Sequence, residues 1–366
     1  MKNSICSLSQ NSINFCCCLT KTKDKLFIFC TLIVLTFFAN SCTIRHGVVM
    51  TVNGPISANK LGTTLPHEHV LVDFARADKG DFARWNKDTV ISKALPFLLE
   101  AKKSGVNSMF ECTTAYAGRD PELFQKLSNA SGLNIITNTG NYGAINDIGN
   151  DYEFAENAEQ ISKRWIDEWK NGIGTSGVRP GFIKIGVPPD SVLQPIQEKV
   201  VTAAALTHLK TGLTINVHIG PFHTANAVLK ILKKEGVDPS AFIWTHAQVS
   251  KLEDLLYLAG MGAWISLDNV SENNINNYVA MLSDFKRNQL LNKVLISHDA
   301  GWYDVVNPKT VTYRGYTTVF THLKPALMQA GLTEKEWKQL TCYNPMNAYS
   351  IRVRKLTNSN KLDRIN

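Results

Sequence analysis

The chain has 366 residues, of which 44% are hydrophobic and 19% charged, and its formal net charge at pH 7 is +8. This composition is typical of a globular protein and argues against disordered, collagen-like and coiled-coil chains. Because no run of five or more Lys and Arg residues occurs, the charge does not indicate a nucleic-acid partner.

Residues 1–41 have the pattern of a signal peptide. Residues 26–39 are apolar or nearly so, lysines precede them, and Cys42 follows shortly after. A membrane-spanning helix needs about 20 apolar residues, whereas a shorter run behind a basic flank is typical of secretion. Small residues ending at a cysteine resemble a bacterial lipoprotein cleavage site, so we expect an exported protein, periplasmic or at the cell surface, whose only membrane contact is a lipid on Cys42. Simple secretion and an uncleaved anchor are the alternatives.

Residues 42–366 are expected to form one domain in which short apolar runs alternate with amphipathic stretches. The apolar runs are 63–72, 106–112, 133–139, 181–186, 213–219, 241–247, 262–267 and 293–298. Stretches with the helical period cover 91–103, 121–131, 154–171, 194–211, 224–236 and 274–288. Glycine follows several of these stretches, as it often does where a helix ends.

Strands that alternate with helices in this way predict a parallel sheet, and eight such units predict closure into a (β/α)8 barrel, also called a TIM barrel. An open doubly wound sheet is the competing architecture, but no G-x-G-x-x-G motif follows the first strand. Active sites of such barrels are built at the C-terminal ends of the strands. Polar residues at strand ends are therefore the informative ones.

The first apolar run ends in His67-Glu68-His69. Residues two apart in a strand face the same side, so His67 and His69 can point together into the barrel mouth while Glu68 faces away. Two imidazoles placed in this way can share one metal ion. Taken alone, a pair of structural histidines is the simpler interpretation.

Three later runs end in further metal-ligand residues, namely His218, His246 and Asp299. A lone histidine at a strand end is usually a hydrogen-bonded core residue, but agreement among four strands is difficult to assign to packing. The fourth run contains Lys184, whose charged amine is costly to bury. Snorkelling or an ion pair is one explanation. In the other, burial and nearby cations lower the lysine pKa, and the neutral amine reacts with carbon dioxide to give a carbamate that bridges two metals.

The order of HxH, Lys, His, His and Asp over strands one, four, five, six and eight resembles the phosphotriesterase family of the amidohydrolase superfamily, which includes phosphotriesterase-related and phosphotriesterase-like lactonase proteins. The segment from Gly54 to His69 is similar to the N-terminal signature of that family, and the resemblance covers roughly residues 48–352. After Asn344-Pro345 the family usually has Arg and Phe where this chain has Asn347 and Tyr349. We expect this departure to affect the anchoring of a helix rather than the chemistry.

The resemblance implies a binuclear centre of two divalent ions, for which Zn²⁺ is the default expectation at a histidine-rich site. Carbamylated Lys184 would bridge the ions, and Asp299 would also be the catalytic residue that accepts a proton. A homodimer is a further implication. The implied ligands are His67, His69 and Asp299 for the more buried ion, and His218 and His246 for the more exposed one.

The resemblance also implies hydrolysis of lactones, carboxylic esters or organophosphate triesters. We predict a small-molecule ester or lactone substrate that is attacked by a metal-bridging hydroxide, with phosphoric ester hydrolysis as the alternative. Tyr142, Trp302 and Tyr303 follow strands three and eight and are candidate walls of the substrate pocket. Arg119 could meet an anionic substrate group, or it could pair with Asp120 at a helix start.

Two other classes of protein remain open. A nuclease-type metal barrel would carry Glu in place of Lys184 and a basic cleft, and the sequence shows neither. A non-catalytic surface lipoprotein could keep the barrel as a binding scaffold, but the complete set of ligand residues argues against it.

Overall fold

The fold was determined from a computed structural model that describes residues 47–73, 85–142, 151–189, 192–309 and 312–357. They lie in one structural unit, His46–Asn366. The predicted signal peptide and Cys42 lie outside the described residues. Within these ranges, no helix is both long enough and apolar enough to cross a membrane.

The predicted alternation of strands and helices is confirmed. The third strand is interrupted at Thr137 and therefore consists of two short strands, β6 and β7. Parallel pairing orders the strands as β3-β5-β6 and as β7-β8-β9-β10-β11-β12. The barrel strands are β3 (Thr64–Glu68), β5 (Ser108–Glu111), β6 (Asn134–Ile136), β7 (Asn138–Thr139), β8 (Phe182–Gly186), β9 (Ile215–His218), β10 (Phe242–Thr245), β11 (Trp264–Leu267) and β12 (Val294–Ile296).

Backbone hydrogen bonds connect the two sets of strands into a (β/α)8 barrel. The Asp299 N–H donates to the His67 carbonyl at 3.1 Å, and the His69 N–H donates to the Ala300 carbonyl at 2.9 Å. These bonds place the end of the first strand beside the end of the eighth. The open doubly wound sheet is therefore wrong for this chain.

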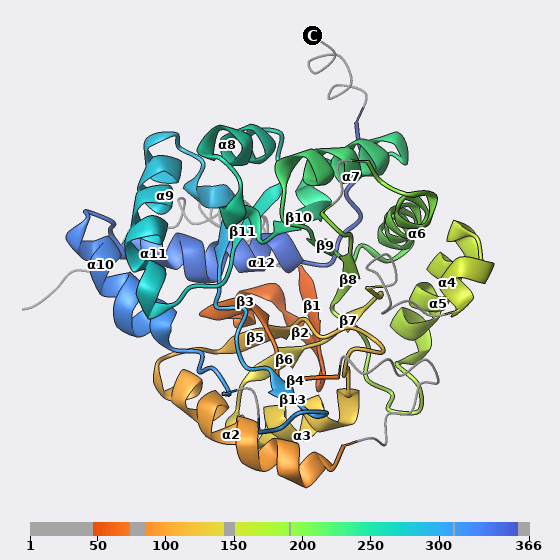
Figure 1. Cartoon of the computed structure of the whole chain (residues 1–366), viewed down its shortest axis with the longest axis horizontal. Helices are drawn as coiled ribbons and strands as arrows, with labels where there is room; N and C mark the ends of the chain where they lie inside the picture. The colour runs from red at the N-terminus through yellow and green to blue at the C-terminus, as the bar shows by residue number, and fades with distance from the viewer. Residues whose placement is uncertain (1–46, 74–84, 143–150, 190–191, 310–311, 358–366) are drawn as a thin grey trace, which may run out of the picture. The chain divides into compact units, whose positions relative to one another are not determined.

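Helices surround the strands, as Figure 1 shows. Glycine ends α3 and α6 as predicted, since Gly132 and Gly212 adopt the left-handed φ values of 70° and 76°. The helix predicted at 154–171 is divided, because Asn157 and Gln160 form a capping box that begins a new helix. The helices are α2 (Lys87–Lys103), α3 (Pro121–Ser131), α4 (Asp151–Ala155), α5 (Ala158–Asn171), α6 (Pro195–Thr211), α7 (Phe222–Lys234), α8 (Leu252–Gly260), α9 (Ile275–Arg287), α10 (Lys324–Gln329), α11 (Glu334–Lys338) and α12 (Asn344–Tyr349).

The C-terminal helix α12 packs at the N-terminal ends of the barrel strands. Buried Asn344 donates from Nδ2 to the carbonyls of Leu291 and Val294, at 2.8 and 2.6 Å. Tyr349 at the other end of α12 stacks on Phe110 of β5, with ring centroids 3.7 Å apart. The departure of this segment from the family pattern therefore leaves the helix anchored.

Smaller strands complete the unit. An antiparallel hairpin, β1 (Val48–Thr51) with β2 (Gly54–Ser57), precedes the barrel. The first predicted strand is too long, since the segment after Glu68 forms a separate short strand, β4 (Leu71–Val72), that pairs with β13 (Tyr303–Asp304).

Candidate metal centre

The ends of β3 and β12 bring three of the predicted ligands together. His69 Nε2 lies 3.1 Å and His67 Nε2 lies 3.6 Å from Asp299 Oδ1. His67 is 1% exposed and His69 is 2% exposed. Alternation along the strand explains the arrangement, because His67 and His69 face one side while the intervening Glu68 faces the other.

Two atoms of this triad test whether a metal ion fits. His67 Nε2 is buried and has no hydrogen-bond partner among the described residues, and buried Asp299 Oδ1 faces two ring nitrogens, His69 Nε2 at 3.1 Å and His67 Nε2 at 3.6 Å. A buried polar atom without a partner costs about 1–3 kcal/mol, so such atoms are rare unless a ligand satisfies them. Imidazole nitrogen and carboxylate oxygen are both common ligands of divalent ions, and the residues present therefore fit a metal.

His218 and His246 form the second part of the centre, at the ends of β9 and β10. Nδ1 of His218 lies 2.8 Å from Nε2 of His246. Two nitrogens that each bind the same tetrahedral ion at 2.0–2.1 Å lie roughly 3.3 Å apart. The two rings would therefore have to move slightly apart to bind an ion between them. The rings of His246 and His67 are also close, with centroids 5.2 Å apart, so the outer pair adjoins the buried triad.

Lys184 of β8 is fully buried beneath these histidines. Its Nζ donates to Asn216 Oδ1 at 2.9 Å, and burial lowers its pKa. Burial also lowers the pKa of His67 to about 4, and the charge of Lys184 acts in the same direction. The Lys184 charge likewise contributes to the lowered pKa of His218, after burial and His246. The strand register agrees with this, because Lys184 pairs with Asn216 and Gly186, two residues later, pairs with His218.

Asp268, which follows β11, connects the two parts. Its Oδ2 lies 2.9 Å from His67 Nδ1, and its Oδ1 lies 2.5 Å from His246 Nδ1. Burial alone would lower the pKa of His246, but the carboxylates of Asp268 and Asp299 together outweigh burial and raise it. By holding both Nδ1 atoms, Asp268 turns both Nε2 atoms toward the metal position. The strand-end pattern could have predicted Asp268, because it directly follows the seventh apolar run.

Glu68 faces away from the centre, as predicted, and binds the end of β12. Its Oε1 accepts hydrogen bonds from Ser297 Oγ and from the backbone and ring nitrogens of His298, and its Oε2 accepts one from the Ala300 N–H. The carboxylate therefore holds the backbone on both sides of Asp299. His298 Nε2 accepts a hydrogen bond from the Val319 N–H, so both of its ring nitrogens are used in the surrounding structure.

A second buried carboxylate supports His69 through a threonine. Thr113 Oγ1 lies 2.8 Å from His69 Nδ1 and donates to Glu111 Oε1 at 2.6 Å. Burial raises the pKa of Glu111 to about 8. The contacts fix the ring of His69 with Nε2 toward Asp299.

The backbone is strained at several positions around the centre. Among the described residues, six other than glycine have left-handed φ values, which such residues rarely adopt; Gln289 follows α9, and the other five lie at the ends of barrel strands or in the loops that follow them. Such conformations cost about 1–3 kcal/mol each and cluster at functional sites. These five residues are Tyr116 (φ 65°), His246 (φ 59°), Asn269 (φ 68°), Asp299 (φ 51°) and Trp302 (φ 68°).

Comparison with known proteins identifies this barrel. The profile of the phosphotriesterase family matches residues 47–349. The chain belongs to the phosphotriesterase family. Over 294 residues it is 25% identical to the phosphotriesterase homology protein of Escherichia coli (strain K12), covering 79% of this chain and 98% of that protein.

Other phosphotriesterase-family relatives have different names. The chain is 26% identical over 314 residues to the aryldialkylphosphatase of Saccharolobus solfataricus, covering 81% of this chain and 97% of that protein. It is 24% identical over 349 residues to the N-acetyltaurine hydrolase of Xenopus tropicalis, covering 82% of this chain and 97% of that protein. The chain is accordingly placed in a hydrolase family, and the match over most of its length agrees with the barrel.

Of the rim residues predicted for this phosphotriesterase-family protein, two contact the ligands. The Tyr142 ring lies 5.4 Å from the His218 ring, and the Trp302 ring lies 4.1 Å from the His69 ring, measured between centroids. Tyr303 instead lies in the short strand β13 and packs against a core cluster that includes Leu71.

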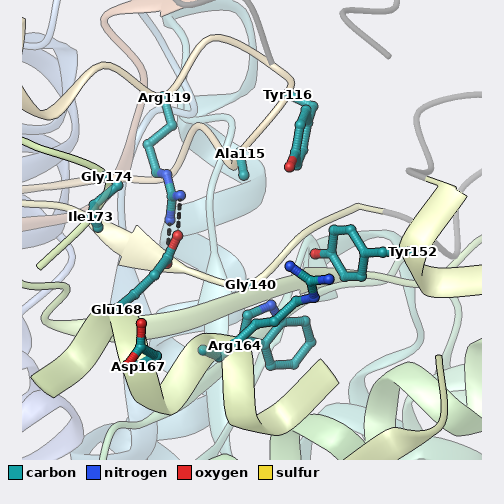
Figure 2. A pocket seen from close by; sticks show the side chains of 11 residues that line it. Ala115, Tyr116, Arg119, Gly140, Tyr152, Arg164, Asp167, Glu168, Ile173 and Gly174 are labelled. Carbon is teal, nitrogen blue, oxygen red and sulfur yellow. Dashed lines mark hydrogen bonds and ion pairs between the residues drawn. The ribbon is translucent and has the colours of Figure 1, made fainter. Parts of the chain in front are cut away.

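The fourth predicted rim residue, Arg119, is 3% exposed and donates to both carboxylate oxygens of Glu168. It therefore pairs with α5 rather than with Asp120, whose side chain caps α3. Arg119 also lines a pocket of about 300 Å³ beside the loops that follow β5 and β7. Figure 2 shows Tyr116, Tyr152 and Arg164 across this pocket from Arg119.

Proposed function

We propose that this phosphotriesterase-family protein is a metal-dependent hydrolase that opens a lactone or cleaves a carboxylic ester. The observation that carries the proposal is the meeting of His67, His69 and Asp299, whose ligand atoms all lie within 4.8 Å of one another, with His67 Nε2 buried and lacking a hydrogen-bond partner among the described residues. Lactones and carboxylic esters come first because the proposed export of the protein would bring it into contact with such compounds outside the cell.

Two divalent ions, most simply Zn²⁺, fit the donor set. His67, His69 and Asp299 would hold the buried ion, and His218 with His246 would hold the outer one. The neutral Lys184 amine would add to carbon dioxide through a new N–C bond and release one proton, giving a carbamate that reaches both ions. Ions bound there would lower the pKa of a bound water and polarise the substrate oxygen.

The chain's own residues would orient the substrate and move the proton. Asp299 Oδ2 lies 3.9 Å from His246 Nδ1 and 19% of the Asp299 side chain is exposed, so this oxygen can accept a proton from the attacking water. Tyr142 and Trp302, whose rings contact His218 and His69, would form apolar walls on two sides of the reacting bond.

Phosphoric ester hydrolysis is the second candidate function. A relative that is 26% identical is named aryldialkylphosphatase, and the same polarisation of an oxygen serves an acyl or a phosphoryl centre. The name N-acetyltaurine hydrolase of another relative adds an amide to the substrates worth testing. A non-catalytic scaffold would have no need to leave a buried ligand atom without a partner.

A substrate screen tests the proposal. Protein starting at residue 43 would be loaded with Zn²⁺ and assayed against lactones, aryl carboxylic esters, phosphotriesters and N-acyl amides at equal concentrations. We expect turnover to be fastest with a lactone or carboxylic ester and to be lost after chelation. Fastest turnover of a phosphotriester would favour the second candidate, and absence of bound metal would remove both.

We further propose that the protein is exported to the periplasm or cell surface through residues 1–41, anchored by a lipid on Cys42, and that it forms a homodimer. Cys42→Ser should release it from the membrane fraction if the cysteine is lipidated. Unchanged membrane association would contradict the lipid anchor. Light scattering of the soluble form would give the mass of the assembly.

A further inference from the structure

The hydroxyl group of Tyr349 lies inside the barrel and joins two strands. Tyr349 is fully buried, and its ring stacks on Phe110. Its hydroxyl donates to the Pro66 carbonyl at 3.1 Å and accepts a hydrogen bond from Asn216 Nδ2, also at 3.1 Å. Pro66 directly precedes His67 in β3, and Asn216 belongs to β9.

Asn216 connects the Tyr349 hydroxyl to Lys184. Its Oδ1 accepts hydrogen bonds from Lys184 Nζ at 2.9 Å and from Thr245 Oγ1 at 2.6 Å. A lysine ammonium and the N–H of a lysine carbamate can only donate hydrogen bonds, so for both forms the amide atom that faces the lysine nitrogen is the oxygen. The amide nitrogen must then face Tyr349, whose hydroxyl is able to accept.

We propose that Tyr349 and Asn216 are positioning residues that hold the Lys184 nitrogen in the orientation required by the metal centre. The inference rests on the proposed metal-dependent function. A lysine that has become a carbamate keeps one N–H, and that group can still donate to Asn216 Oδ1. The same hydrogen bond would therefore direct the carbamate away from Asn216 and toward the histidines.

The hydroxyl, rather than the ring, carries this role. A phenylalanine at position 349 would keep the stacking on Phe110 but would remove the acceptor of Asn216 Nδ2, and it would leave the Pro66 carbonyl with only the Cys112 thiol, 3.9 Å away. A buried unsatisfied donor is unfavourable, so the Asn216 side chain would shift until Nδ2 found another partner. Any such shift would move Oδ1 out of line with Lys184 Nζ, from which it now accepts a hydrogen bond.

Reconstitution with cobalt tests the proposal on Tyr349→Phe. Metal-free protein starting at residue 43 would be titrated with Co²⁺ at graded bicarbonate concentrations, and the visible absorption of the bound cobalt would be recorded. We expect Tyr349→Phe to need about tenfold or more Co²⁺ or bicarbonate than the unmodified chain, the usual scale for groups that orient metal ligands. Its cobalt spectrum should also be altered.

Thr207→Val is the matched control. Thr207 is a fully buried residue of α6 whose hydroxyl bonds Ser162 and the Ala203 carbonyl, outside the barrel interior. It should lose stability without any change in the cobalt titration. If both variants weaken cobalt binding equally, or if Tyr349→Phe behaves as the unmodified chain, the proposal is wrong.

Asn216→Ala is the second variant and keeps the proposal testable if Tyr349→Phe is insoluble. It should shift the bicarbonate requirement in the same direction and further, because the direct partner of Lys184 is lost, whereas an unshifted titration would contradict the proposal. Failure of the unmodified chain to bind cobalt would instead remove the proposed metal-dependent function and the basis of this inference with it.

Discussion

The buried and outer parts of the metal centre differ in how firmly their ligands are held. His67 and His69 are almost fully buried, and the Nδ1 atom of each contacts a buried side chain, Asp268 or Thr113. In the outer part, Asp268 also holds His246, but the only hydrogen bond found for the His218 ring among the described residues is with His246. A bound ion would have to separate these two rings, whereas the triad is already arranged around its position.

One centre can therefore combine a half whose ligands are preorganised with a half whose ligands can move. Ligands held by surrounding hydrogen bonds lose little freedom when an ion binds. We therefore expect the buried ion to bind more tightly and to leave later. The outer half remains able to change its coordination when a substrate arrives.

Removing a ligand from each half gives the largest expected effects. Asp299→Ala should lower the hydrolysis rate by about 1,000-fold, the scale of a loss of several kcal/mol of charge stabilisation, and should abolish binding of the buried ion. His218→Ala should lower activity but retain that ion. Metal analysis of both purified variants, with rates measured in parallel, checks the difference. Retention of a tightly bound, chelator-resistant ion by Asp299→Ala, or its loss from His218→Ala, would contradict the prediction.

Stepwise chelation separates the two halves without mutation. A weak chelator added slowly should first yield a protein that contains about half of its metal, and only a strong chelator should remove the rest. The reason is that the inner ligands are buried and already oriented. Metal analysis after each step provides the measurement. A single loss of both ions at one chelator concentration would show that the halves do not differ.

Asp268→Asn should weaken both halves, because Asp268 holds His67 and His246 together. Asparagine replaces one carboxylate oxygen by an NH₂ group, which cannot accept a hydrogen bond from a ring N–H. One histidine would therefore lose its partner, and we expect metal affinity to fall by about 10–100-fold. Asp254→Asn on α8 is the matched control for the loss of one carboxylate. Competition with a coloured chelator measures the affinities, and weakening confined to one ion would show that Asp268 does not couple the halves.

The smallest effect is expected at the pocket beside α5. Arg164 lines it, and the Arg164 side chain is 54% exposed. If a distant part of the substrate reaches this pocket, Arg164→Ala should raise KM a few-fold and leave kcat nearly unchanged, since only uniform binding is lost. Steady-state kinetics with a short and a long substrate test this, and an unchanged KM for both would exclude the pocket from binding.

The sequence predicted the barrel and the meeting of strand-end residues because parallel strands place their C-terminal ends at one rim. His67, His69 and Asp299 meet for that reason, although Asp299 lies more than 200 residues after the two histidines in the chain. Asp268 follows the same rule and could have been included.

What could not be predicted depends on loops and on competing local signals. Tyr303 pairs with Leu71 because the chain after β3 continues into a second short strand. Arg119 meets Glu168, a residue of α5 whose position depends on the packing of an entire helix. The helix at 154–171 is divided because the capping side chain of Asn157 overrides the apolar period around it.

The hydrogen bonds between His67 and Asp299 and between His69 and Ala300 lie where the circle of strands returns to its beginning. An ion held by His67, His69 and Asp299 would therefore cross-link the first and last strands of the barrel at the point where the barrel closes. Its binding energy would add to the free energy of unfolding of the entire cylinder. Loss of the metal would then lower the stability of the folded protein as well as its catalytic rate.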